Sequence, residues 1–148
     1  MRIVMLGTGY VGLVSGACFA EFGMDVVCVD QDASKIARLQ KGEIPIYEPG
    51  LDELVQKNAQ RKTLSFTTDL KAAMIGAEAV FIAVGTPSRR GDGHADLSYV
   101  YQAAKDIAAN ITDYTVVVTK STVPVGTGRE VESIISKIVP RECFDVAS

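Results

Sequence analysis

The chain has 148 residues, of which 47% are hydrophobic and 22% charged, the ordinary composition of one globular domain. Its net charge of −3 at pH 7 excludes a strongly basic surface for nucleic acid or an anionic membrane. No apolar run approaches the roughly 18 residues of a membrane span. Three cysteines without a CxxC pair, and a single histidine, argue against a disulfide framework or a metal site and favour the cytoplasm.

Short apolar strands alternate with amphipathic helices along the chain. Strands are predicted over residues 2–6, 25–29, 64–67, 79–84, 115–119 and 144–147. Helices are predicted over residues 11–22, 33–41, 51–58, 70–74, 98–110 and 128–139. Asp32 is the expected N-cap of the second helix, in which Ile36, Ala37 and Leu39 should face inward. This alternation predicts an α/β fold of the doubly wound (Rossmann) type, a mostly parallel sheet with helices on both faces.

Residues 7–12 read Gly-Thr-Gly-Tyr-Val-Gly, a G-x-G-x-x-G pattern directly after the first strand and at the start of a helix. In such a turn Gly7 permits the tight bend, Gly9 lets the backbone approach a diphosphate, and Gly12 lets helix and strand pack closely. The helix N-terminus offers unpaired N–H groups and a partial positive charge to the phosphates. A glycine turn without a ligand is the competing interpretation, but the strand–turn–helix context favours a dinucleotide site.

Asp30 ends the second strand, 18 residues after Gly12. An acid at this place hydrogen-bonds a ribose 2′-hydroxyl of the bound dinucleotide. Its carboxylate would repel the 2′-phosphate of NADP, so the expected cofactor is NAD. Lys35 either reaches the adenosine or is solvated on its helix, and the sequence leaves both open.

Two further loops follow strands in the same way. Gly85, Thr86 and Pro87 come after the fourth strand, and Ser121 and Thr122 come after the fifth. Ligands of doubly wound sheets bind beyond the carboxyl ends of the strands, so these hydroxyls can face the ribose, the nicotinamide and the reacting end. An ordinary turn at residues 85–87, and capping of the next helix by Ser121 or Thr122, are the competing interpretations.

Taken together, four stretches resemble the UDP-glucose/GDP-mannose dehydrogenase family: residues 7–12, 42–51 (GEIPIYEPGL), 85–87 and 120–127 (KSTVPVGT). Residues 46–50 and 123–126 lean toward the UDP-glucose branch over its GDP-mannose sibling. The resemblance implies a two-step oxidation of UDP-glucose with two NAD. The C6 alcohol becomes an aldehyde, a cysteine captures it as a thiohemiacetal, and water releases the final thioester as a uronate.

The resemblance also implies roles for residues of this chain. Thr122 would hold a water or the substrate C6 group near the chemistry, as the one catalytic residue. The cofactor-binding set would be Gly7, Gly9, Tyr10, Val11, Gly12, Asp30, Lys35, Gly85, Thr86, Pro87 and Ser121. The family's nucleophilic cysteine, with its lysine and asparagine partners, and the central helix through which these enzymes dimerise have no counterpart here.

We therefore expect residues 1–148 to be an NAD-binding Rossmann domain cut from a longer homodimeric protein that acts on a UDP-sugar. By itself the domain should bind NAD without oxidising UDP-glucose. A stand-alone NAD-binding regulatory module is an alternative, although it would not need the stretches at 42–51 and 120–127. An S-adenosylmethionine methyltransferase also begins with a strand, a glycine loop, a helix and an acid, but its substrate-side motifs are missing.

Overall fold

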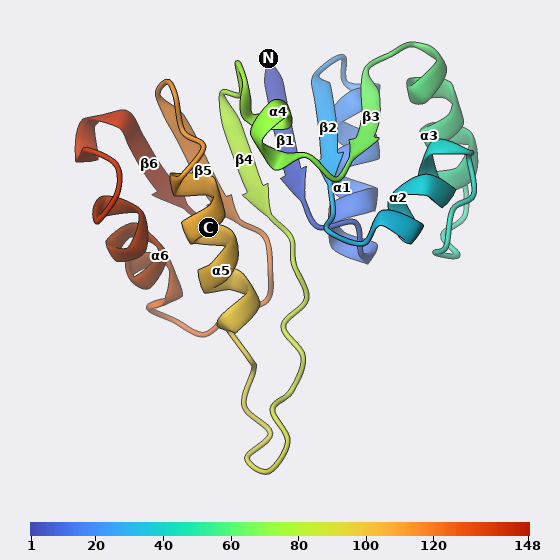
Figure 1. Cartoon of the computed structure of the whole chain (residues 1–148). Coiled ribbons are helices and arrows are strands. Elements are labelled where there is room, and N and C mark those ends of the chain that lie inside the picture. Colours follow the sequence, from blue (N-terminus) through green and yellow to red (C-terminus); the bar gives the residue numbers. More distant parts are fainter.

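The computed structural model describes all 148 residues, which form one sheet of six parallel strands between two layers of helices (Figure 1). The strands are β1 (Arg2–Leu6), β2 (Asp25–Val29), β3 (Leu64–Thr67), β4 (Ala79–Ile82), β5 (Thr115–Thr119) and β6 (Phe144–Ala147). Their order in the sheet is β3-β2-β1-β4-β5-β6, and every neighbouring pair is parallel. The predicted doubly wound fold is therefore confirmed.

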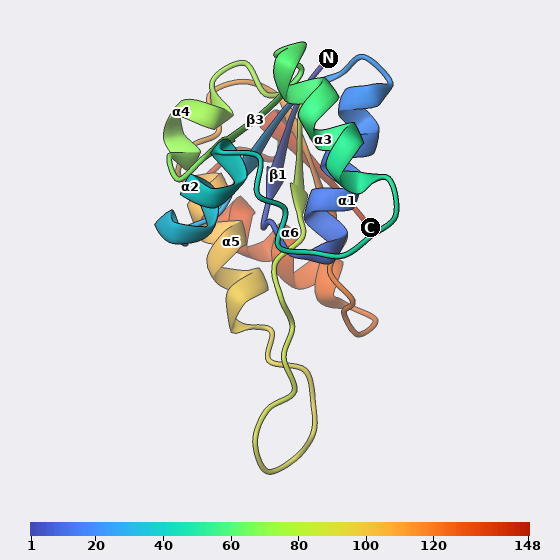
Figure 2. The same ribbon diagram turned by 90° about the vertical axis from the view of Figure 1, so that its right-hand side faces the viewer.

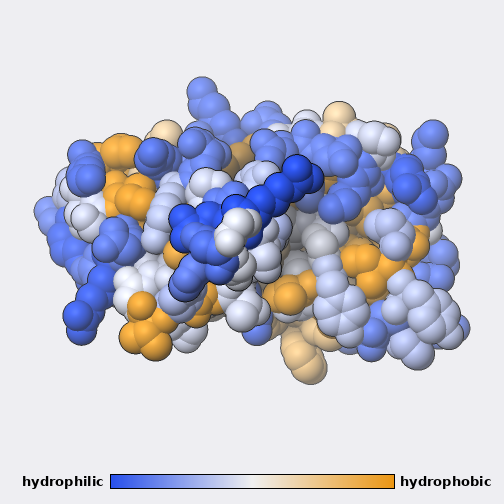
Figure 3. Space-filling view, turned by 90° about the horizontal axis from the view of Figure 1, so that it is seen from below, coloured by the Kyte–Doolittle hydropathy of each residue, from blue (hydrophilic) through white to orange (hydrophobic).

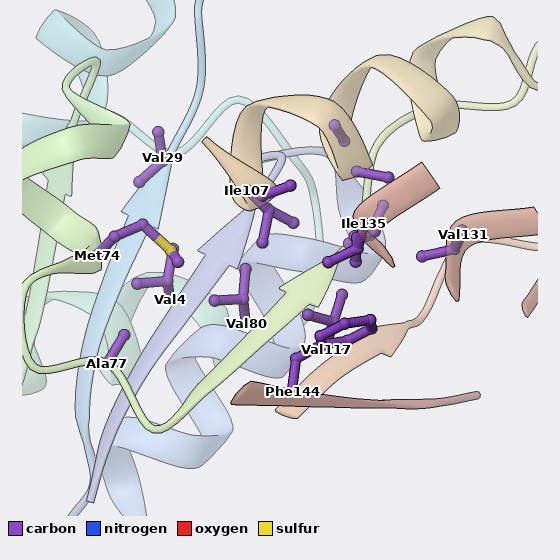
Figure 4. Packing of buried hydrophobic residues seen from close by; sticks show 14 of the residues in the cluster. Val4, Val29, Met74, Ala77, Val80, Ile107, Val117, Val131, Ile135 and Phe144 are labelled. Atoms are coloured by element: carbon purple, nitrogen blue, oxygen red, sulfur yellow. The ribbon is translucent and has the colours of Figure 1, made fainter. Parts of the chain in front are cut away.

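Three helices cover each face of the sheet. One face carries α1 (Tyr10–Glu21), α2 (Ala33–Gln40) and α3 (Leu51–Gln60), packed over a buried cluster of 14 residues. The other carries α4 (Leu70–Met74), α5 (Ser98–Ala108) and α6 (Thr127–Ser136), over a cluster of 18 residues. In this second cluster Val4, Val80 and Val117 of the strands meet Ile107 of α5 and Ile135 of α6 (Figure 4). Burial on both faces explains why the strands are continuous β-branched runs.

Local signals account for most helix ends. Asp32 caps α2, because its side chain accepts a hydrogen bond from the Lys35 N–H at 3.1 Å, as expected. Gly23 follows the end of α1 with a φ of +94°, which stops that helix where the sequence predicts. The expectation for the buried face of α2 is partly wrong: Ile36 and Leu39 are buried, but Ala37 is exposed.

Several other element ends differ from the prediction by one to three residues; for example, α3 extends to Gln60 and α5 ends at Ala108. β4 ends at Ile82, two residues early, because both neighbouring strands end beside it: Ile82 pairs with Leu6 of β1 and with Thr119 of β5, the last residues of those strands. The Val84 carbonyl then accepts a hydrogen bond from the Ser121 hydroxyl. Beyond α6, which begins at Thr127 and ends at Ser136, a 3₁₀ turn spans Arg141–Cys143 and was not predicted. The Arg141 guanidinium fixes this turn by bonding to Glu132 and Asp145.

The buried thiol of Cys28 lies in the core beneath α1. Its burial raises the pKa of the thiol to about 12, so it is a hydrophobic packing group. Cys18, in contrast, is only partly buried. None of the helices combines the length and the apolar character that crossing a bilayer requires.

The chain returns from β3 at one edge of the sheet to β4 in its middle, so the connections after β1 and β4 diverge. Such a divergence leaves a crevice at the carboxyl edge of the sheet. The connection from β4 to α5 also extends far beyond this edge as a narrow arm (Figures 1 and 2), closed by a bridge between Ser88 and Ala95. Figure 3 looks onto the same edge, where hydrophobic patches lie on both sides of a hydrophilic strip.

Candidate functional site

The turn between β1 and α1 places bare backbone at the crevice. Gly7 has a φ of +109°, and a Cβ there would lie 2.5 Å from the Ala83 carbonyl oxygen, so only glycine fits. A Cβ on Gly12 would overlap the carbonyl oxygen of Gly7, which is why α1 can pack directly on the turn. Gly9 differs from both, because nothing lies within 4 Å of the place its Cβ would take. The space above Gly9 is therefore open to a ligand.

The N-terminus of α1 faces that open space. Its first helical hydrogen bond runs from the Leu13 N–H to the Gly9 carbonyl at 2.9 Å, so the N–H groups of Tyr10, Val11 and Gly12 have no helical acceptor. The N-cap, Gly9, has no side chain to satisfy them, and no acidic residue lies in the first turn. Free donors and the helix dipole make this end of α1 a site for an anion.

Asp30 lies beside the glycine turn and is held by three short hydrogen bonds. Its Oδ2 accepts from the Thr8 N–H at 3.0 Å and from the Thr8 hydroxyl at 2.7 Å, and its Oδ1 accepts from the Asp32 N–H at 3.0 Å. Burial opposes ionisation of Asp30, but the bonds from Thr8 and Asp32 and the charge of Lys35 outweigh it and lower the pKa. The carboxylate is thus ionised at neutral pH, with room on Oδ1 for one more donor.

Lys35 and Thr8 complete this corner. The Lys35 ammonium lies 3.7 Å from Asp30 Oδ2, so it lines the crevice beside that carboxylate. Thr8 is completely buried, and both of its donors bond to Asp30. Its importance was not predicted, since a threonine between two glycines has no chemical signature of its own.

The loops after β4 and β5 are tied to each other. The Ser121 hydroxyl donates to the Val84 carbonyl at 2.7 Å, and the Thr86 hydroxyl donates to the Thr122 carbonyl at 3.2 Å. Both hydroxyl protons are therefore engaged within the chain, and the oxygens remain as acceptors. The Thr122 hydroxyl makes no hydrogen bond, and its residue is exposed at the crevice.

Helix capping does not explain Ser121 or Thr122. The N-cap of α6 is Gly126, in a left-handed conformation with a φ of +95°, and no side chain caps it. The buried Thr127 hydroxyl bonds to the Pro124 carbonyl at 2.7 Å and stabilises the turn that precedes the helix. The capping interpretation is therefore wrong.

Tyr10 connects the glycine turn to the stretch at residues 42–51. Its hydroxyl donates to Glu48 Oε2 at 2.7 Å. This hydrogen bond, together with the charge of Glu48, raises the pKa of Tyr10. The side chain of Tyr10 is half exposed at the rim of the crevice, so the 42–51 stretch borders the site without lining it.

These elements enclose a cavity of about 1020 Å³. All the predicted cofactor and catalytic residues line it except Gly12, which lies beneath the turn. Free helix N–H groups, an open glycine backbone and an ionised carboxylate in one crevice fit a dinucleotide. The cavity is also lined by residues that were not predicted: Leu6, Thr8, Val29, Gln31, Thr68, Leu70, Ala83, Val84, Tyr99, Gln102, Ala103, Asp106, Ala109 and Asn110.

Six of these 14 unpredicted residues lie along one face of α5 or just beyond its end at Ala108. Positions 99, 102, 103, 106, 109 and 110 follow the spacing of three and four residues that places side chains on the same side of a helix. The sequence therefore shows which residues share this helix face, but it does not show that the face borders the cavity.

Comparison with known proteins shows the family to which the chain belongs. A model of the UDP-glucose/GDP-mannose dehydrogenase family, NAD binding domain, matches residues 1–148. The chain is 66% identical over 148 residues to a UDP-glucose 6-dehydrogenase of Rhizobium meliloti (strain 1021), covering 100% of this chain and 34% of the relative. It is 54% identical over 148 residues to the UDP-glucose 6-dehydrogenase TuaD of Bacillus subtilis (strain 168), covering 99% and 32%.

Solved structures agree. A GDP-mannose dehydrogenase from Pseudomonas aeruginosa, crystallised as a ternary complex, superposes with a TM-score of 0.93 at 37% identity, covering 99% of this chain and 35% of that one. A UDP-glucose dehydrogenase from Pyrobaculum islandicum gives 0.92 at 38% identity, covering 99% and 35%. The chain thus spans about a third of the length of these relatives. The match excludes the methyltransferase alternative, and the chain is an NAD-binding domain of the UDP-glucose/GDP-mannose dehydrogenase family.

Proposed function

We propose that this domain holds NAD across the crevice, with the diphosphate at the α1 N-terminus, the adenosine ribose at Asp30 and the nicotinamide at the loops after β4 and β5. The observation that carries the proposal is the pairing of free helix N–H groups with the ionised, hydrogen-bonded carboxylate of Asp30. The ribose has a hydroxyl to donate to Oδ1. A 2′-phosphate would place a second anion there.

The acceptor oxygens of Ser121 and Thr86 support the nicotinamide end of the proposal. Their protons are engaged by the Val84 and Thr122 carbonyls, so each oxygen can accept from a carboxamide N–H. NAD, when bound, supplies the acceptor for a hydride. The free hydroxyl of Thr122 is positioned at the same edge to hold a water or a substrate hydroxyl.

We further propose that the domain serves a longer, homodimeric cytoplasmic enzyme that oxidises the C6 alcohol of UDP-glucose to a uronate. The names of the relatives from Rhizobium meliloti and Bacillus subtilis support this substrate. The similarity to the crystal structure of a GDP-mannose dehydrogenase makes a GDP-sugar the alternative substrate. Incubated with NAD and UDP-glucose, residues 1–148 alone should yield no uronate; any uronate would mean that the chain carries the complete machinery.

The cofactor proposal is tested by calorimetric titration of this chain with NAD, NADP and S-adenosylmethionine. NAD should bind at least about tenfold more tightly than NADP, a difference of about 1.4 kcal/mol. Asp30→Ala should weaken NAD binding and reduce the difference between the NAD and NADP affinities, because Lys35 then faces the ribose 2′-position without its carboxylate partner.

Asp32→Ala is the matched control. Asp32 is two residues away and caps α2, but its side chain does not line the cavity. This variant should lose about 1 kcal/mol of stability and keep the preference for NAD. Equal NAD and NADP affinities in the unmodified chain would refute the role of Asp30.

A further inference from the structure

The cavity continues past Asp30 along the face of α5, where none of the roles assigned above applies. Its floor is formed by Leu6 and Val29 at the ends of β1 and β2. Leu70, the first residue of α4, and Ala103 of α5 form its apolar sides. Val29 and Ala103 are buried, and Leu6 and Leu70 are partly buried against the core. This arrangement is a hydrophobic slot suited to a flat ring.

The rim of the slot on α5 is polar, and each of its two amides keeps a second N–H as well as its oxygen. Gln102 donates through Nε2 to Asp106 Oδ1 at 2.9 Å, and Asn110 donates through Nδ2 to the Asp106 carbonyl at 2.7 Å. These bonds orient the amides so that Gln102 Oε1, Asn110 Oδ1 and Asp106 Oδ2 remain free to accept.

The charges around the slot reinforce this pattern. Lys35 is the only basic residue that lines the cavity, and its ammonium pairs with Asp30 at 3.7 Å and not with Asp106. Asp106 therefore has no basic partner at the rim. A group that reaches Asp106 meets a carboxylate, which favours a hydrogen-bond donor and disfavours another acceptor.

We propose that Asp106, oriented by Gln102, makes the dinucleotide site selective for a base that carries an exocyclic amino group, as adenine does. The proposal rests on the proposed function, which places the ribose at Asp30. The nicotinamide end is bounded by the loops at 85–87 and 121–122, so the base on the β2 side enters the slot between α4 and α5. A base with a carbonyl in place of the amino group would set oxygen against oxygen there.

Calorimetric titration of this chain with NAD and with nicotinamide hypoxanthine dinucleotide tests the proposal. The second compound differs by a carbonyl in place of the adenine amino group. It should bind about tenfold more weakly than NAD, the discrimination expected of one partly exposed hydrogen bond. Asp106→Asn should bring the two affinities to within about twofold, because the amide can donate to a carbonyl as well as accept from an amine.

Asp113→Asn is the control, since it also removes one negative charge near the end of α5 but does not line the cavity. It should keep the discrimination, and circular dichroism should show both variants folded. Equal binding of the two dinucleotides by the unmodified chain, or discrimination that survives Asp106→Asn, would overturn the proposal while leaving NAD binding intact. Failure of both compounds to bind would instead overturn the proposed function and this inference together.

Discussion

Two glycines of the turn, Gly9 and Gly12, should respond in opposite ways to the same added methyl group. In Gly12→Ala the new Cβ would overlap the Gly7 carbonyl oxygen and lie 2.9 Å from its carbon, and both atoms are backbone. No side-chain rotation relieves such a contact, so α1 must move away from the turn. In Gly9→Ala the Cβ meets nothing within 4 Å, and the backbone, at φ −73° and ψ −167°, suits any residue.

The magnitudes separate the two variants. Overpacking against backbone lowers the free energy of unfolding by up to about 3 kcal/mol. The higher helix propensity of alanine at position 12 offsets about 1 kcal/mol of this loss. The net loss of about 2 kcal/mol lowers the Tm of a domain of this size by about 4–8 °C. At position 9, replacing an N-cap glycine costs less than about 1 kcal/mol, but the methyl group occupies the space above the free N–H groups. NAD affinity should then fall about tenfold or more.

Differential scanning calorimetry and NAD titration of both variants test these separate roles of Gly9 and Gly12. Gly12→Ala should lose stability, and Gly9→Ala should lose NAD affinity at nearly unchanged Tm. A Gly9→Ala chain that binds NAD normally would show that the diphosphate does not approach this backbone. A Gly12→Ala chain of unchanged Tm would show that the close packing of α1 on the turn is not required.

Two further outcomes are expected. The pKa of Asp30 lies below its ordinary 3.8, so its carboxylate stabilises the fold above that pH and the contribution is lost as the pH falls through the folded pKa. In urea denaturation, the difference in unfolding free energy between the unmodified chain and Asp30→Asn should be constant above about pH 5 and should shrink as the pH falls below about 4. A difference that stays constant in acid would contradict this prediction. Ser121→Ala removes the 2.7 Å bond to the Val84 carbonyl and should cost about 1 kcal/mol, seen as a Tm lower by about 2–4 °C. Unchanged stability would show that the hydroxyl does not join the two loops.

The strands and their parallel arrangement could be predicted from the sequence because each is a short apolar run flanked by turn residues. The ends of elements depend on tertiary contacts and were less accurate. β4 ends at Ile82 because its neighbours β1 and β5 end there, and the Val84 carbonyl instead accepts a hydrogen bond from Ser121, 37 residues later in the chain. The 3₁₀ turn at Arg141–Cys143 is held by bonds from Arg141 to Glu132 and Asp145. No local pattern encodes such partners.

The site divides in the same way. Gly7, Gly9 and Asp30 have signatures in spacing and residue type, so the sequence places them in the crevice. Thr8 acquires its role only when β1 and β2 are paired in register, which brings its hydroxyl to Asp30. The α5 face is periodic in the sequence, but what it borders depends on α4, which packs beside α5 on the same face of the sheet. Residues that act through pairing were therefore missed.

Hydrogen bonds between loops explain how an exposed edge can hold a defined site. Thr8 joins the turn after β1 to Asp30 after β2, Tyr10 joins the same turn to Glu48, and Thr86 joins the loop after β4 to Thr122 after β5. Each bond links segments that belong to different strands or helices, so the loops hold one another in place. A ligand that enters a crevice of this kind loses less of its binding free energy to ordering the protein. The two buried clusters keep the strand ends in register, and the loop-to-loop bonds convert that register into fixed positions for donors and acceptors.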